Sequence, residues 1–255
     1  MMFPGRIAAV SYLNTVPFIY GIEHARTLHA DLLLSPPSAN VEAFANGRAD
    51  IALIPSAAVP LLEDAKIITQ YCLGAHNPVR TVVIMSDTPI ENISKLYLDA
   101  HSRTSALLSK ILCAELWNIA PEYVHMDDYS VVDQAQHGDG FLLIGDKVFD
   151  YEGRFAYKYD LAEAWINMTG LPFVFAVWVA RHNVPQEVIS GLEKALEYGV
   201  AHIPESISWY GHSGKPYALD YLTNNIDFIF DKQKHKAISL YWEKGMKFMP
   251  RVNPG

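Results

Sequence analysis

The sequence predicts an α/β fold with a mostly parallel sheet. Over the first 180 residues, short apolar runs alternate with amphipathic segments of helical periodicity. Strands that alternate with helices in this way are typical of a sheet covered by helices. No glycine- or serine-rich linker divides the chain, so a second domain is expected to be inserted into the first.

The first half of the chain is predicted to hold five strands, the first of them buried. Each is an apolar run too short for a helix; the runs are residues 6–10, 31–35, 49–55, 66–73 and 80–86. Pro17 suits the first turn of a helix, where its missing N–H costs nothing. A second helix is expected over residues 39–47, where Gly47 ends it, and a short helix over residues 56–63.

The second half first continues this alternation and then becomes helical. Strands are predicted at residues 95–99, 122–126, 141–145 and 172–180. The last of them is β-branched and aromatic throughout, as expected of a strand buried on both faces. Helices are predicted at residues 103–117 and 160–168, and then from Pro185, Pro204, Pro216 and Asp231. No strand is expected after residue 180.

Composition and charge exclude several classes of protein. The chain has 255 residues, of which 50% are hydrophobic and 19% charged, which argues against disorder. Its 20 basic and 28 acidic side chains give a net charge of −8, whereas a nucleic-acid-binding protein is usually basic. No apolar run approaches the roughly 20 residues that a membrane span needs. We therefore expect neither a nucleic-acid partner nor a membrane, and no feature specifies an oligomeric state.

Cysteine usage and the N-terminus indicate a cytoplasmic protein. Cys72 and Cys113 lie far apart in apolar contexts, so they form neither a zinc motif nor a disulfide framework. The first residues carry no secretory signal pattern. Buried free thiols in a reducing compartment are the expectation. No GxGxxG follows a strand, and neither GxxxxGK[ST] nor HExxH occurs, so neither a cofactor nor a metal is expected.

Small polar residues follow five of the predicted strands. In open α/β sheets, ligands bind beyond the carboxyl ends of the strands, so these residues form the candidate site. The candidates are Tyr12, Asn14, Ser56, Arg80, Thr81, Ser102, Arg103, Thr104, Ser105 and Asp146. Their convergence is a stronger signal than any single motif.

The strongest element is the start of the helix at Ser102. Hydroxyl groups and free backbone N–H groups at a helix N-terminus bind anions, and Arg103 would add a forked donor. The alternative is ordinary helix capping, since Ser and Thr are favoured there. For Asn14 and Ser56, the alternative to ligand binding is a role as helix caps. For Thr81, the alternative is an ordinary strand residue. Capping is favoured for Asp146, and Tyr12 is either a core residue or a pocket wall.

Six segments in this order resemble one enzyme family. They are SYLNT, GRADIALIPS, NPVRTVVI, LDAHSRTSALL, LIGD and TGLPFVFAVWV, with YALDYLTNNIDF a looser match. Together they are similar to the chorismate dehydratases of the futalosine route to menaquinone. That resemblance implies a two-lobed α/β fold of the type II periplasmic-binding-protein class, with a ligand cleft between the lobes. The buried strand at residues 172–180 must return the chain to the first lobe before the final helices, so we predict lobe one at residues 1–85 and 180–255, and lobe two at residues 86–179.

The resemblance also implies an activity and residue roles. Asn14 matches the family's catalytic asparagine, and Thr81 stands where a hydroxyl residue, often Ser, is expected. Ser56, Thr104 and Ser105 match cleft positions of the sister enzyme, 1,4-dihydroxy-6-naphthoate synthase. The implied reaction is dehydration of chorismate, a small dicarboxylate, to 3-[(1-carboxyvinyl)oxy]benzoate without cofactor.

Two alternatives to the dehydratase remain. One is the sister synthase, which uses a histidine base in its second lobe; the matching LIGD stretch here has none. The other is a solute-binding protein for a small carboxylate, which the absence of a signal sequence disfavours.

Overall fold

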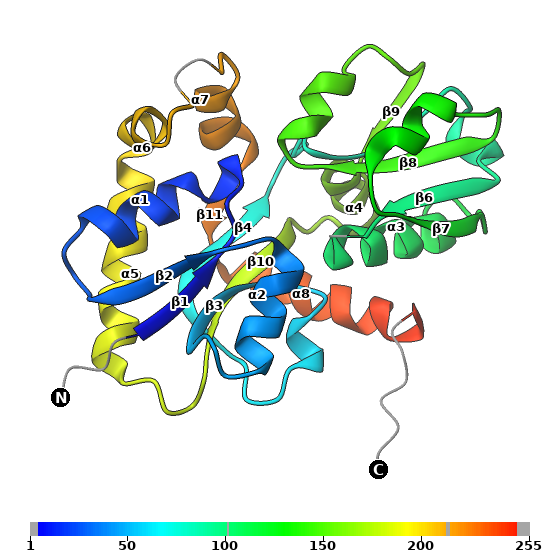
Figure 1. Ribbon diagram of the computed structural model, residues 1–255. Coiled ribbons are helices and arrows are strands. Elements are labelled where there is room, and N and C mark those ends of the chain that lie inside the picture. Colours follow the sequence, from blue (N-terminus) through cyan, green and yellow to red (C-terminus); the bar gives the residue numbers. More distant parts are fainter. Residues whose placement is uncertain (1–4, 101, 213–214, 249–255) are drawn as a thin grey trace.

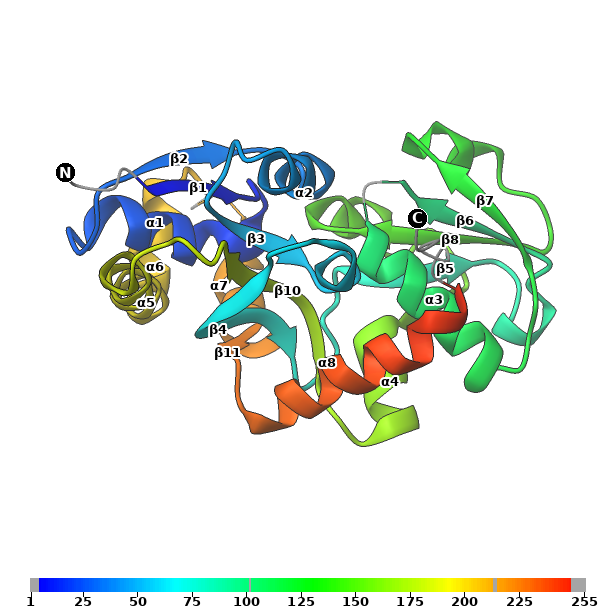
Figure 2. The ribbon, with the colours of Figure 1, turned by 90° about the horizontal axis from the view of Figure 1, so that it is seen from below.

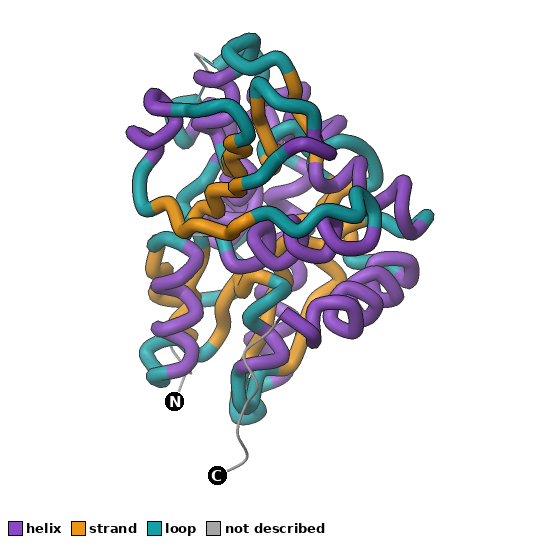
Figure 3. The backbone as a smooth tube through the Cα atoms, turned by 90° about the vertical axis from the view of Figure 1, so that its right-hand side faces the viewer, coloured by secondary structure: helices purple, strands orange, loops and turns teal. Residues whose placement is uncertain are grey.

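The protein has two lobes, each built on its own sheet (Figure 1). The computed structural model describes residues 5–100, 102–212 and 215–248. The first sheet has the strand order β11-β4-β10-β3-β1-β2 and the second has the order β7-β6-β8-β5-β9. Helices and strands are mixed in both lobes (Figure 3).

The observed strands reproduce the nine predicted ones and add two. The strands are β1 Gly5–Ala9, β2 Ala30–Leu34, β3 Ile51–Pro55, β4 Lys66–Ala75, β5 Val82–Ser86, β6 Lys95–Asp99, β7 Glu122–Met126, β8 Asp139–Ile144, β9 Tyr157–Asp160, β10 Phe173–Ala180 and β11 Asp227–Ile229. The additions are β9 and β11, so the expectation of no strand after residue 180 was wrong. Both are short edge strands, β9 of four residues and β11 of three.

The helices follow the predicted segments with one main exception. They are α1 Val16–His24, α2 Pro37–Ala45, α3 Arg103–Glu115, α4 Leu161–Thr169, α5 Gln186–Ala201, α6 Ile203–Trp209, α7 Ala218–Asp220 and α8 Lys232–Gly245. The short helix expected over residues 56–63 is only a 3-10 turn, Val59–Leu61. Pro60 limits it, because proline cannot donate a helical hydrogen bond.

The sheets are mixed, not mostly parallel as the alternation predicted. β10 is antiparallel to both β3 and β4, and β5 is antiparallel to both β8 and β9. The chain enters the second sheet through β5 and returns to the first through β10. The implied lobe boundaries at residues 85 and 180 therefore differ from sheet membership: β5 pairs in the second sheet and β10 in the first. An apolar strand has the same residue pattern whichever sheet it joins, so the sequence does not show in which lobe β5 and β10 pair.

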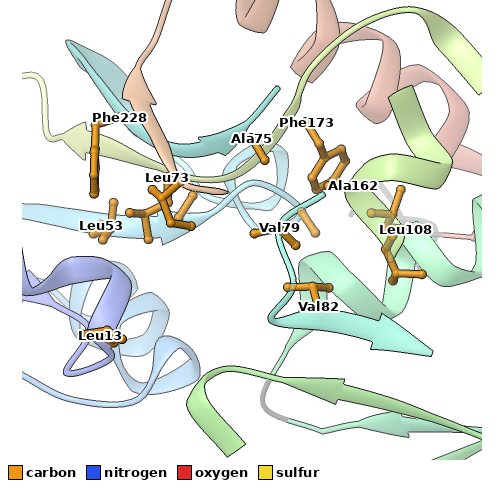
Figure 4. Close-up of a cluster of buried hydrophobic side chains, with 14 of the residues drawn as sticks. Leu13, Leu53, Leu73, Ala75, Val79, Val82, Leu108, Ala162, Phe173 and Phe228 are labelled. Carbon is orange, nitrogen blue, oxygen red and sulfur yellow. The ribbon is translucent and has the colours of Figure 1, made fainter. Parts of the chain in front are cut away.

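Helices cover both faces of the first sheet. The alternation of side chains along the strands sends Ile7 and Leu53 into one apolar cluster, which α1 and α5 complete. Ala8 and Ile54 enter the cluster on the opposite face, which α2 and α8 complete. The first cluster continues across to the second lobe, where α3 and α4 pack (Figure 4). The two lobes thus share a continuous apolar core behind the cleft.

The C-terminal helix α8 ties the two lobes together. It runs from the first lobe along α4 and α3 of the second (Figure 2). Tyr241 Oη donates to the carbonyl oxygen of Thr104 at 3.0 Å, and Trp242 Nε1 donates to that of Ser56 at 2.8 Å. Lys244 pairs with Glu115 at 2.6 Å. α8 therefore fixes the start of α3 relative to the first sheet.

We expect Gly199→Ala to destabilise the fold, because α1 and α5 approach each other closely at this residue. A Cβ at Gly199 would lie 1.9 Å from the carbonyl oxygen of Pro17. The helices must separate, at a cost of about 1–3 kcal/mol, even though alanine is the better helix former. Gly5→Ala is the control, since its Cβ would meet only Val188 at 3.4 Å. Urea unfolding measures both, and equal stability of the two variants would contradict the close approach.

Candidate active site

A cleft lies between the two lobes, at the ends of several central strands. Its free volume, including the part open to solvent at its mouth, is about 660 Å³. Its apolar wall includes Val10, Leu53, Leu73, Val79, Ile144 and Phe175. Its polar residues are Tyr12, Asn14, Thr81, Ser102, Thr104 and Ser105. Six of the ten candidate residues therefore line one cleft.

Asn14 is held in the cleft by the turn that follows β1. The 3-10 turn Leu13–Thr15 is tied down by Thr15, whose buried hydroxyl donates to the carbonyl oxygen of Tyr12 at 2.7 Å. The Asn14 Oδ1 atom is buried and has no hydrogen-bond partner. An unpaired buried acceptor costs free energy, so this atom is suited to a ligand donor.

Thr81 enters the cleft from the segment that connects the lobes. Its side chain is buried, and its Oγ1 lies 2.8 Å from the phenol oxygen of Tyr221. Tyr221 belongs to the first lobe and begins a π-helix, Tyr221–Asn225. The Asn14 amide lies beside the same phenol and, as a hydrogen-bonding neighbour, lowers its pKa. Thr81 and Asn14 therefore meet around Tyr221, although 67 residues separate them in the sequence.

The start of α3 contributes three hydroxyl groups to the cleft. Ser102 caps the helix: its Oγ accepts from the Ser105 N–H at 3.3 Å and donates to Ser105 Oγ at 2.7 Å. Thr104 Oγ1 accepts from the Ala57 N–H at 3.2 Å and donates to the carbonyl oxygen of Phe175 at 3.3 Å. Capping and the anchoring of α3 to the first lobe therefore account for part of the hydroxyl pattern. The free N–H groups of the first turn remain donors at the cleft.

Tyr12 forms part of the cleft wall and lies near two acidic residues, Asp99 and Asp146. Burial and the nearby carboxylates of Asp99 and Asp146 raise the pKa of its phenol. Asp99 accepts a hydrogen bond from Tyr129 Oη at 2.7 Å, and that phenol also accepts from the Ile144 N–H at 3.1 Å. Tyr12 therefore stays protonated and presents a neutral hydroxyl.

Ser56 and Asp146 are placed elsewhere, not on the cleft wall. Ser56 is fully buried, and its hydroxyl donates to the carbonyl oxygen of Val174 at 2.7 Å. Asp146 starts a 3-10 turn without capping it, and its carboxylate pairs with Lys215 across the lobes at 3.1 Å. Both side chains are thus engaged by partners far away in the sequence.

The two candidate arginines also lie off the cleft wall. Arg80 has a positive φ of 67°, and its guanidinium pairs with Asp220 at 3.1 Å and lies over the ring of Phe149. Arg103 is exposed on α3. Among the described residues that line the cleft, none carries a charge. Anion binding there would depend on hydroxyl and N–H donors.

Sequence reasoning missed Tyr221, the phenol between Asn14 and Thr81. It lies in the predicted helical region, and nothing in its local pattern distinguishes it from a core tyrosine. The only available signal was the loose match of YALDYLTNNIDF to the family pattern. Cys72 and Cys113 are both buried free thiols, as expected. No helix within the described ranges is long and apolar enough to cross a membrane.

Comparisons with solved structures identify the fold. A protein of Archaeoglobus fulgidus superposes with a TM-score of 0.76 at 15% identity, over 95% of this chain and 97% of that one. A Candida albicans protein described as having the generic periplasmic-binding-protein fold gives 0.67 at 12% identity, over 96% and 90%. The aliphatic sulphonate binding protein of Escherichia coli gives 0.60 at 16% identity, over 97% and 94%. The expected periplasmic-binding-protein fold is confirmed.

Comparisons of sequence identify the family. A chorismate dehydratase of Thermus thermophilus is 24% identical over 226 residues, which is 80% of this chain and 80% of that protein. A sequence model described as menaquinone biosynthesis matches residues 5–247, nearly the whole chain. The resemblance seen in the segments from SYLNT to TGLPFVFAVWV is thereby confirmed: the chain belongs to the menaquinone biosynthesis family.

Proposed function

We propose that this protein is a chorismate dehydratase that forms 3-[(1-carboxyvinyl)oxy]benzoate. The observation that carries the proposal is the meeting of Asn14 and Thr81 in one interlobe cleft of a menaquinone biosynthesis protein. The similarity to the Thermus thermophilus enzyme supports the same activity. The buried free thiols fit a cytoplasmic location, which we also propose.

The cleft suits a small, partly apolar dicarboxylate. We propose that the ring of chorismate lies against the apolar wall, with one carboxylate at the N-terminus of α3. The N–H groups of the first turn and the Ser105 hydroxyl would bind that carboxylate without an arginine. Tyr12, kept protonated by its surroundings, would donate to the other polar end of the substrate.

The reaction needs positioning and electrostatic stabilisation more than strong acid chemistry. The ring carbon that bears the enolpyruvyl ether loses its proton, and charge builds on the ring carboxylate through the diene. Fixed donors at the start of α3 would stabilise that charge. The neighbouring carbon then loses its hydroxyl group, and the ring becomes aromatic. The proton and the hydroxyl together make the one water released, and aromatisation drives the reaction forward.

The proton acceptor is proposed to be the substrate itself. No His, Asp or Glu is among the described residues that line the cleft. Asn14 and Thr81 are neutral groups and too weakly basic to remove a ring proton at neutral pH. The side-chain carboxylate of chorismate lies close to this proton in the molecule. We propose that it takes the proton while Asn14 and Thr81 hold the leaving hydroxyl.

The test is to mix purified protein with chorismate and follow the ultraviolet spectrum. We expect the cyclohexadiene absorption to be replaced by that of a substituted benzoate, at the same rate with and without EDTA. A rate that falls when EDTA is added would contradict a reaction that needs no metal ion. Heat of binding without any spectral change would instead favour a solute-binding protein. A protein that neither binds chorismate nor turns it over would favour the sister synthase, whose substrate differs.

A further inference from the structure

Tyr221 lies behind the cleft, between the two residues assigned to the substrate hydroxyl. Its side chain is 1% exposed, and its phenol oxygen is 2.8 Å from Thr81 Oγ1. It comes from the first lobe, whereas Thr81 directly precedes β5 of the second. The Phe149 ring packs against it from the second lobe in an edge-to-face pair, with the ring centroids 6.1 Å apart. Tyr221 is therefore held by both lobes at the point where they meet.

The unpartnered acceptor on Asn14 favours one direction for the hydrogen bonds. If Thr81 donated to Tyr221, the phenol proton would be available to Asn14 Oδ1. That oxygen has no partner, so the Asn14 amide contacts the phenol through its NH₂ group. By distance alone, either oxygen of the Thr81–Tyr221 pair can be the donor. With the phenol oxygen accepting from Asn14, its own proton goes to Thr81 Oγ1. The Thr81 hydroxyl proton remains free to point into the cleft.

We infer that Tyr221 is a positioning residue that orders Asn14 and Thr81 into a matched acceptor and donor for one substrate hydroxyl. The chain of donors runs from Asn14 Nδ2–H to Tyr221 Oη–H to Thr81 Oγ1–H. Asn14 Oδ1 would accept a hydrogen bond from the substrate hydroxyl, and Thr81 would donate a hydrogen bond to the oxygen of that hydroxyl. Without Tyr221, the amide could rotate and the threonine hydroxyl could turn away.

This inference rests on the proposed dehydration, in which that hydroxyl is the leaving group. A hydrogen bond from Thr81 stabilises the negative charge that develops as the carbon–oxygen bond breaks. Successive hydrogen bonds polarise one another in a buried site, so the chain strengthens the last donor. No proton is transferred along the chain, and the released water takes its proton from the substrate ring.

The surroundings keep Tyr221 a neutral donor. Burial is the largest cause of a raised pKa for its phenol, and the negative charges of Asp146 and Asp160 add to it. The phenol therefore does not ionise over the physiological pH range. Asp160 itself is occupied by N–H groups, accepting from Ala162 at 3.0 Å and from Arg80 at 2.6 Å. It is thus engaged away from the phenol.

The test is Tyr221→Phe, which removes only the hydroxyl group. We expect kcat for chorismate to fall about 10–100-fold, on the scale of the loss when a hydrogen bond that orients a metal ligand is removed. KM should change less than about threefold, because the variant still holds the substrate carboxylates. Tyr159→Phe is the control. Tyr159 lies on β9, outside the cleft lining, and its phenol oxygen accepts one hydrogen bond, from the Ile90 N–H at 2.9 Å, so this variant should lose some stability but not activity.

A double variant separates positioning from general loosening of the fold. Thr81→Val removes the last donor, so Tyr221→Phe added to it should cost less than it does alone. If the double variant lost kcat by the product of the two single losses, or if Tyr221→Phe kept the wild-type kcat, the inference would be overturned. The dehydratase function would still stand. A wild-type protein that does not turn chorismate over would reject the function, and the inference with it.

Discussion

Asn14→Ala is expected to lower kcat for chorismate about 10²–10³-fold, the range found when one preorganised polar group is removed from a reacting centre. The turn Leu13–Thr15 is held by Thr15 and its backbone, so the alanine variant should keep its fold. The loss arises because the Asn14 Oδ1 atom is the unpartnered acceptor in the cleft. Steady-state kinetics on the purified variant measures the change.

A matched control distinguishes the cleft from a general effect of removing an amide. Asn225 also has a buried, unpartnered Oδ1, but it lies outside the cleft and donates to the carbonyl oxygen of Pro78 at 2.9 Å. Asn225→Ala should therefore keep kcat within about threefold. The Asn14 variant should still bind the product in titration calorimetry. Full turnover by Asn14→Ala would remove this residue from the mechanism.

The fold was predictable for those elements whose formation depends on the local pattern of apolar and polar residues. Buried apolar runs predicted the central strands, because a strand covered on both faces has no polar alternation. The edge strands β9 and β11 were missed because they have only four and three residues, and their pairing partners lie far away in the sequence. Strand direction was also missed. It depends on where the chain crosses between the lobes, which no single segment records.

The site was predictable for residues whose position follows from a strand end, and much less so for their partners. Asn14 follows the buried strand β1, and Thr81 precedes the buried strand β5. Both residues line the cleft. The Ser56 hydroxyl is instead used by Val174, 118 residues away, and the Arg80 guanidinium by Asp220, 140 residues away. Local sequence cannot show that a polar group is already satisfied by such a distant partner. The same distance concealed Tyr221.

Asp227→Ala is expected to lower the free energy of unfolding by about 3–5 kcal/mol, the usual cost of leaving a buried charge without its partner. Lys234, on α8, is 0% exposed, and its Nζ lies 2.7 Å from Asp227 Oδ2. Its other contacts are the Ile229 carbonyl oxygen at 2.7 Å and His76 Nε2 at 3.1 Å. Neither of these replaces a carboxylate. Urea unfolding should show a lower midpoint with an unchanged slope.

The double variant Lys234→Met, Asp227→Ala tests whether the loss comes from the orphaned charge. Methionine keeps most of the buried volume and needs no counter-charge, so the double variant should recover much of the stability lost by Asp227→Ala. Lys247→Ala, which breaks a surface pair with Glu115, should cost at most about 1 kcal/mol. If the double variant were as unstable as Asp227→Ala, the carboxylate would be stabilising β11 through its own backbone contacts. Recovery would instead show that Lys234 requires Asp227 because α8 buries an ammonium group where it crosses β4.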